Sequence, residues 1–219
     1  MQLRKKMFIT TLSLITIMLL TVISYAVSPL QQAKTVVKES FPEILSSLES
    51  NYKKYEYQTK DQVKKSYLGE PFQHFIIQDI DENKSLYDQI EETSFYVFPV
   101  MYNGKIMTDI TVSLENNKWK VIDIGGSLNK TIYEVSNKYG LSDSKVLRNN
   151  KSIYVVAKKE DKEVAYLPFI ADLEHGFKEK EIVDENKFKK HLVEKVKEYV
   201  DMEKNNRYEN LIDIPVGRN

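Results

Sequence analysis

The chain has 219 residues and a formal net charge of zero, with 42% hydrophobic and 29% charged residues. These proportions are typical of a globular protein and exclude wholesale disorder, which requires low hydrophobicity together with a high net charge. No basic excess favours nucleic-acid binding, and the absence of cysteine excludes disulfides and thiolate metal sites.

Residues 1–26 have the pattern of an export signal. Positions 4–6 are basic, residues 7–23 are uncharged, and Ser24-Tyr25-Ala26 places small residues at the −3 and −1 positions of a signal-peptidase site. The alternative is an uncleaved anchor, because the apolar run approaches the roughly 20 residues that span a bilayer. In either case the rest of the chain is expected outside the cytoplasm, in the medium or the cell envelope. Membrane contact is expected only through residues 7–26, when they are retained.

The composition agrees with export. Lys, Asn, Ile and Tyr are abundant and Cys is absent, which is typical of exported proteins of Gram-positive bacteria with low genomic GC content.

Residues 27–58 are predicted to be an N-terminal helical segment, since apolar residues recur at helical spacing from Pro29 to Glu49. Pro42 predicts a break or kink near Phe41, because proline cannot donate the helical hydrogen bond.

The segment 59–126 is predicted to be a helix followed by an antiparallel meander. Thr59 and Gln62 fit a capping box at the start of the helix, and Gly69 fits its stop. The sequence then becomes rich in aromatic and β-branched residues, which favours strands. Strands are predicted over residues 72–78, 94–102, 105–115 and 118–124, with tight turns at Asn103-Gly104 and Asn116-Asn117.

Residues 127–203 are predicted to be a second α+β unit that ends in an amphipathic helix. Ser127 fits the N-cap and Gly140 the stop of a first helix over residues 128–139. The last helix has an apolar stripe and is otherwise charged. The remaining elements are strands over residues 145–148, 152–158 and 163–169, the last helix over residues 185–203, and a loose tail over residues 204–219.

The predicted fold class is α+β, an antiparallel β-meander packed against helices. The elements form either one domain or two related αβ units. A repeat is suggested by the spacing from Gly69 to Pro99, which is similar to that from Gly140 to Pro168. Both prolines are predicted at a sheet edge or a bulge, because proline donates no ladder hydrogen bond.

Residues 59–126 contain the motifs Leu68-Gly69-Glu70-Pro71-Phe72, Phe95-Tyr96-Val97-Phe98-Pro99-Val100, Asn103-Gly104-Lys105 and Lys118-Trp119-Lys120-Val121. With these motifs the segment resembles PepSY-like and cystatin-like domains of secreted bacterial proteins. The resemblance implies a small α+β fold with a helix on an antiparallel sheet. It also implies a non-catalytic extracellular module that contacts another protein.

The aromatic strand is the main candidate for a binding surface. Tyr96, Phe98 and Tyr102 share one predicted strand, and Trp119 lies nearby in the meander. If helices cover both faces of the sheet, these residues are core. If one face is open, it forms an apolar patch of the kind that marks partner sites, and an edge strand near Pro99 offers backbone groups to a peptide. We therefore predict a non-enzymatic module that binds an extracellular protein or peptide through this meander.

Catalytic chemistry has little support, and no catalytic residue, metal or cofactor is predicted. His74, His175 and His191 lack the spacing of zinc motifs. The alternative function is a small exported hydrolase whose site is built from dispersed carboxylates and from these histidines, which would have to converge in space.

Two further motifs have ordinary interpretations. Asp79, Asp81 and Asn83 begin like a calcium loop, but the Gly and Glu that an EF-hand requires are missing, so a solvated acidic loop is expected. Gly125-Gly126-Ser127 could present backbone N–H groups to an anion. A turn followed by a helix N-cap is the favoured interpretation.

Overall fold

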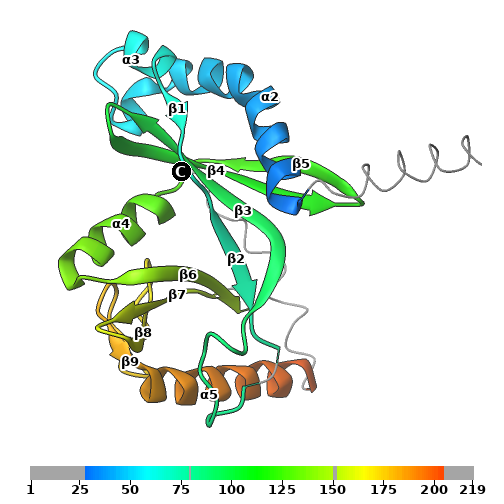
Figure 1. The fold of residues 1–219 in the computed structure, drawn as a ribbon, viewed down its shortest axis with the longest axis vertical. Coiled ribbons are helices and arrows are strands. Elements are labelled where there is room, and N and C mark those ends of the chain that lie inside the picture. The colour runs from blue at the N-terminus through cyan, green and yellow to red at the C-terminus, as the bar shows by residue number, and fades with distance from the viewer. Residues whose placement is uncertain (1–27, 79, 150–151, 205–219) are drawn as a thin grey trace, which may run out of the picture.

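The computed structural model describes residues 28–78, 80–149 and 152–204. The expected export signal and residues 205–219 of the expected tail lie outside these ranges. No helix within them is both long enough and apolar enough to cross a membrane. The α+β class is confirmed, because helices pack on a mixed, mostly antiparallel sheet of nine strands (Figure 1).

Among the described residues, the first half of the chain supplies three helical elements and five strands. α2 continues through Pro42 and bends in Figure 1, as the proline predicts. The helical elements are α2 (Pro29–Ser50), the 3-10 turn η1 (Tyr52–Tyr55) and α3 (Lys60–Lys64). The strands are β1 (Tyr67–Leu68), β2 (Phe72–Ile76), β3 (Glu91–Tyr102), β4 (Lys105–Glu115) and β5 (Lys118–Ile124).

The second half supplies two helices and four strands. The predicted helices are confirmed within two residues at each end, and Gly140 ends the first of them with a φ of 66°. The helices are α4 (Leu128–Tyr139) and α5 (Glu185–Lys204). The strands are β6 (Ser142–Asn149), β7 (Ser152–Lys159), β8 (Lys162–Tyr166) and β9 (Val183–Asp184).

The sheet joins the two halves through one parallel pair. The strand order is β5-β4-β3-β2-β6-β7-β8-β9, with β1 beside β3. All named strands pair antiparallel except β2 and β6, where His74 lies opposite Val146 and Phe75 opposite Leu147. Two antiparallel meanders therefore run outward from the centre of the sheet. Whether they are a repeat stays a prediction.

Both predicted hairpin turns of the first meander are confirmed. Asn103 and Gly104 have φ angles of 49° and 76°, and Asn116 and Asn117 have φ angles of 51° and 59°. Asparagine and glycine tolerate this left-handed region, and two such residues in succession match the twist of the flanking strands. These turns set the register of β3, β4 and β5 from local sequence alone.

The second predicted helix is too long, and Gly69 is not its stop. α3 ends at Lys64, and Tyr67 and Leu68 instead pair with β3. The N–H of Gly69 donates to the Pro99 oxygen at 2.9 Å, and a Cβ on Gly69 would lie 2.9 Å from Cγ of Pro99. Close packing of the backbone on β3, rather than the end of a helix, requires glycine here.

Pro99 is predicted at an edge or a bulge, and the edge alternative is wrong, because β3 is an inner strand. The register of β3 with β4 shifts between Val100 and Met101, so an irregularity of the ladder does lie next to Pro99. On one side β4 pairs with β3, and on the other β1 reaches Val100 while β2 reaches Val97. The Pro99 oxygen faces Gly69. In a β-strand the nitrogen and the oxygen of one residue point to the same side. The nitrogen therefore faces the gap between β1 and β2, where no ladder hydrogen bond is needed. Pro168 lies just beyond the end of β8.

Helices cover both faces of the sheet. Along β3, Tyr96 and Phe98 belong to the core under α2, whereas Val97 belongs to the core under α4. Along β7, Tyr154 belongs to the core under α5 and Val155 to that under α4. Since side chains alternate along strands, α2 and α5 lie on one face over opposite halves. α4 lies on the other face, where the halves meet (Figure 1).

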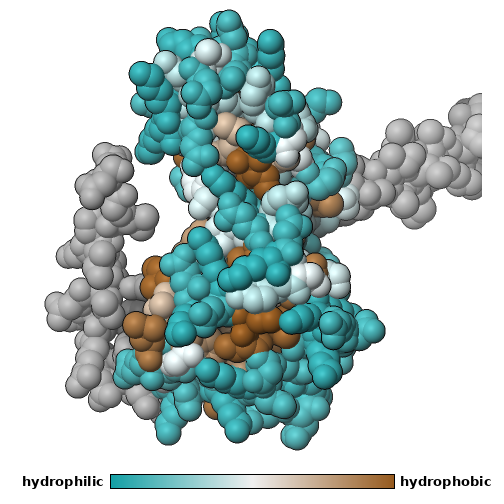
Figure 2. Space-filling model, turned by 90° about the vertical axis from the view of Figure 1, so that its left-hand side faces the viewer, coloured by the Kyte–Doolittle hydropathy of each residue, from teal (hydrophilic) through white to brown (hydrophobic). Residues whose placement is uncertain are grey.

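The segment between β2 and β3 belongs to the second core, although the sequence assigns it to the first unit. Leu86 is fully buried there with residues of β7 and α5. Glu163 on β8 accepts hydrogen bonds from the Leu86 N–H at 2.8 Å and from the Ser85 hydroxyl. On the face shown in Figure 2, hydrophobic residues gather mainly on the half of the molecule that contains α5, and polar residues cover most of the rest.

The N-terminus of α4 is capped from β4 rather than by its own N-cap residue. Ser127 occupies the N-cap position but makes no side-chain cap hydrogen bond. The buried Asp109 carboxylate instead accepts the Asn129 N–H at 3.2 Å and the Asn129 side-chain amide at 2.7 Å. Burial raises the pKa of Asp109, and these hydrogen bonds oppose that rise. The Gly125 N–H donates to the Asp109 backbone oxygen at 2.8 Å, so Gly125-Gly126-Ser127 forms the turn that leads into α4.

Removing this cap should destabilise the protein far more than removing the Ser127 hydroxyl. Asp109→Ala leaves buried N–H groups without an acceptor, so we expect a loss of about 2–3 kcal/mol in the free energy of unfolding. Ser127→Ala should change it by less than about 0.5 kcal/mol. Urea unfolding of both variants at pH 7 measures the difference. Equal losses would show that Asp109 does not cap α4.

Candidate functional site

The predicted aromatic surface is covered by α2. Tyr96 is 3% exposed and Phe98 is 1% exposed, and both lie in the core that α2 closes. Tyr102 and Trp119 are partly buried against the same core. The Trp119 ring N–H donates to the Gln32 side chain on α2 at 3.0 Å. The apolar stripe of α2 is buried by packing against this face of the meander.

The structure places a different group of side chains around an open cavity. The cavity has a volume of about 340 Å³ and lies at the junction of β2, β3, β4 and β6. The parallel pairing of β2 with β6 brings His74 and Arg148 to the same place, although the sequence separates them widely. The lining residues are His74, Ile76, Thr93, Ser94, Phe95, Ser113, Leu114 and Arg148.

His74 is the buried polar group of this cavity. Its side chain is 2% exposed, and neither ring nitrogen has a hydrogen-bond partner among the described residues. Burial, and secondarily the positive charge of Arg148, lowers the pKa of His74 to about 4. At neutral pH the imidazole is therefore uncharged and carries one donor and one acceptor.

Phe95 holds the two nitrogen-bearing groups in place. The His74 ring packs against it in a tilted arrangement with a centroid distance of 4.6 Å, and the Arg148 guanidinium lies 5.2 Å from the centroid of Phe95. Three hydroxyl residues, Thr93, Ser94 and Ser113, complete the polar lining. The Thr93 hydroxyl is already engaged, since it donates to the His74 backbone oxygen at 2.6 Å.

The cavity is chemically suited to an anion. Arg148 supplies a permanent positive charge with several donors, and neutral His74 can add one further hydrogen bond. No acidic side chain is among its described lining residues. His74 is a candidate from the sequence, whereas Arg148 is not. No local signal could have joined them, because their proximity depends on a pairing between distant strands.

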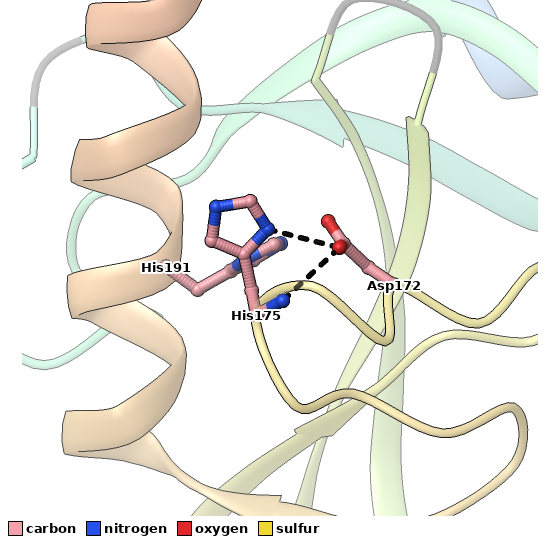
Figure 3. Close-up of side chains that lie close together, drawn as sticks. All are labelled: Asp172, His175 and His191. Carbon is pink, nitrogen blue, oxygen red and sulfur yellow. Dashed lines mark hydrogen bonds and ion pairs between the residues drawn. The ribbon is translucent and has the colours of Figure 1, made fainter.

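The other two histidines converge elsewhere in the fold. Asp172, His175 and His191 present ligand-type atoms that lie within 4.8 Å of one another (Figure 3). Nδ1 of His175 lies 2.9 Å from Oδ1 of Asp172, and Nζ of Lys195 lies 3.1 Å from Oδ2. Burial opposes ionisation of Asp172, but hydrogen bonds from His175 and Lys195 lower its pKa to about 2.

The calcium-like residues form a turn. Asp79 lies outside the described residues. Oδ1 of Asp81 accepts the Asn83 N–H at 3.0 Å, and Oδ2 lies 3.6 Å from Nζ of Lys84. Asp81 thus stabilises its own loop, which agrees with the solvated acidic loop predicted from the sequence.

Comparison with known proteins gives no relative: no family model, no curated protein and no solved structure matches the chain. The resemblance to PepSY-like and cystatin-like domains therefore stays an expectation from the sequence.

Proposed function

We propose that this protein is a non-enzymatic binding module, exported from the cell, that holds an acidic segment of an extracellular protein or peptide. The carboxylate of that segment enters the cavity lined by His74 and Arg148. The observation that carries this proposal is a deeply buried histidine with unsatisfied nitrogens beside an arginine in an open cavity.

The energetic cost of leaving the buried His74 imidazole without a hydrogen bond supports the proposal that a ligand binds there. A buried polar group without a partner costs about 1–3 kcal/mol. A ligand that hydrogen-bonds to the ring would recover this energy on binding. A carboxylate accepts from the neutral ring N–H and from the guanidinium at once, which explains why the two groups share one cavity.

The size and openness of the cavity favour part of a larger partner. A volume of about 340 Å³ is at the small end of the range for complete small-molecule ligands. One acidic side chain or a C-terminal carboxylate fits such a volume, and the rest of the partner can lie on the surrounding sheet. The charge of Arg148 selects acidic over basic segments.

Replacing Arg148 should weaken binding of an acidic peptide without unfolding the protein. For a short fluorescent peptide rich in Glu, we expect Arg148→Gln to raise the dissociation constant at least tenfold, the equivalent of about 1.4 kcal/mol. Fluorescence anisotropy at low salt measures it, and the same peptide with Gln for Glu should not bind.

Lys145→Gln is the matched control. Lys145 is a cation on the same strand, but it lies over the rings of Phe75 and Tyr87 and does not line the cavity. Its removal should change the affinity less than twofold. Equal weakening by both variants would mean that only net charge attracts the peptide, and no binding by the wild type would end the proposal.

A small exported hydrolase is the second candidate, and the grouping of Asp172 with His175 favours it. A carboxylate that accepts a hydrogen bond from an imidazole orients the ring as a general base. This function requires turnover of an ester or peptide substrate by the wild-type protein and its loss in His175→Gln.

A further inference from the structure

We infer that Asp172, His175 and His191 form a binding site for a borderline divalent cation such as Zn²⁺. Their ligand-type atoms lie within 4.8 Å of one another. Two imidazole nitrogens and one carboxylate oxygen are a donor set that suits Zn²⁺ and not Ca²⁺ or Mg²⁺. The site lies under α5, on the opposite face of the sheet from His74.

The three ligands come from two elements that the cation would join. Asp172 and His175 lie in the segment between β8 and β9, and His191 lies on α5 (Figure 3). The His175 and His191 rings are 5.3 Å apart between centroids. A cation bound to Nδ1 of His175 and Oδ1 of Asp172 takes the place of the proton in the hydrogen bond between these two atoms, and that proton leaves to solvent.

Neighbouring side chains orient the ligands as in established metal sites. The Tyr154 hydroxyl lies 3.0 Å from Nε2 of His191 and fixes its ring in the core. Lys195 holds Oδ2 of Asp172, which leaves Oδ1 toward His175. Hydrogen bonds of this kind to ligating histidines and carboxylates set the orientation of the ligands.

The neighbouring charges also limit the affinity of the site for Zn²⁺. Glu194 lies 4.0 Å from Nε2 of His175, on the other ring nitrogen from the one that faces Asp172. The positive charge of Lys195 acts against a cation at the same carboxylate. We therefore expect micromolar rather than nanomolar binding, and a structural role in which the cation fastens the segment between β8 and β9 to α5.

Calorimetric titration of the untagged, chelator-treated protein with ZnCl₂ tests the inference. We expect one Zn²⁺ per chain, no binding of Mg²⁺ or Ca²⁺, and a rise of about 5 °C or more in the thermal midpoint at a hundredfold excess over the dissociation constant. His175→Gln should weaken Zn²⁺ binding at least tenfold. It is preferred to a His191 variant, because His191 is packed between core aromatic rings.

Glu174→Gln is the matched control. Glu174 is an exposed carboxylate in the same segment and is not one of the three ligands, so its loss should leave Zn²⁺ binding unchanged. Asp172→Asn should behave like His175→Gln. No stoichiometric Zn²⁺ binding by the wild type, or equal weakening by His175→Gln and Glu174→Gln, would overturn the inference and leave the cluster as an ion-paired clamp.

Discussion

Replacing Phe98 with alanine is expected to lower the free energy of unfolding by about 3–5 kcal/mol, because the ring is fully buried and its loss leaves a cavity under α2. The loss should appear as a lower midpoint in guanidinium unfolding with an unchanged slope. Phe98 thus acts in stability rather than in partner contact.

Tyr133→Ala is the control for this prediction. Tyr133 lies on α4 and is 64% exposed, so truncating it should change the free energy of unfolding by no more than about 0.5 kcal/mol. If Phe98→Ala cost no more than Tyr133→Ala, α2 would not cover this face, and an aromatic binding surface on the meander would be restored.

Acid should destabilise the wild-type protein more than a His74→Gln variant. The pKa of His74 is about 4 in the folded state against 6.5 for the free side chain. Above pH 6.5 both the folded and unfolded forms are neutral, and between pH 6.5 and 4 only the unfolded form takes up the proton. Stability therefore falls as the pH drops through this window.

The expected size of the effect is about 2 kcal/mol of additional loss in the wild type between pH 7.5 and pH 5. Urea unfolding of both proteins at the two pH values gives this difference, and contributions from groups such as Asp109 cancel between them. Identical pH dependence would mean that His74 titrates normally, and that it is neither desolvated nor close to Arg148.

Local features of the fold could be predicted because their cause lies in a few neighbouring residues. The Asn103-Gly104 turn needs only two residues that tolerate positive φ, and the apolar stripe of α5 needs only helical spacing. The local pattern predicts a helix up to Gly69, whereas Tyr67 and Leu68 form a strand because they pair with β3. No local pattern reveals such a pairing.

The candidate sites were harder to predict, since each depends on contacts between distant segments. Tyr96 and Phe98 have the composition of a binding patch, and only the path of α2 decides that they are core. Arg148 has no motif around it and becomes significant only when β6 lies beside β2. His175 and His191 meet because a loop folds back on α5, which their spacing does not indicate.

The parallel pair at the centre of the sheet sets an order of assembly. Within each meander, strands pair with their neighbours in the chain, and the short hairpins among them close quickly and at little entropic cost. Pairing β2 with β6 joins segments about 70 residues apart and must overcome a larger loop-closure entropy. This seam is therefore expected to form late in folding. The cavity between His74 and Arg148 exists only once β2 and β6 have paired. A partly folded chain therefore has no binding site, and ligand binding stabilises the completed sheet.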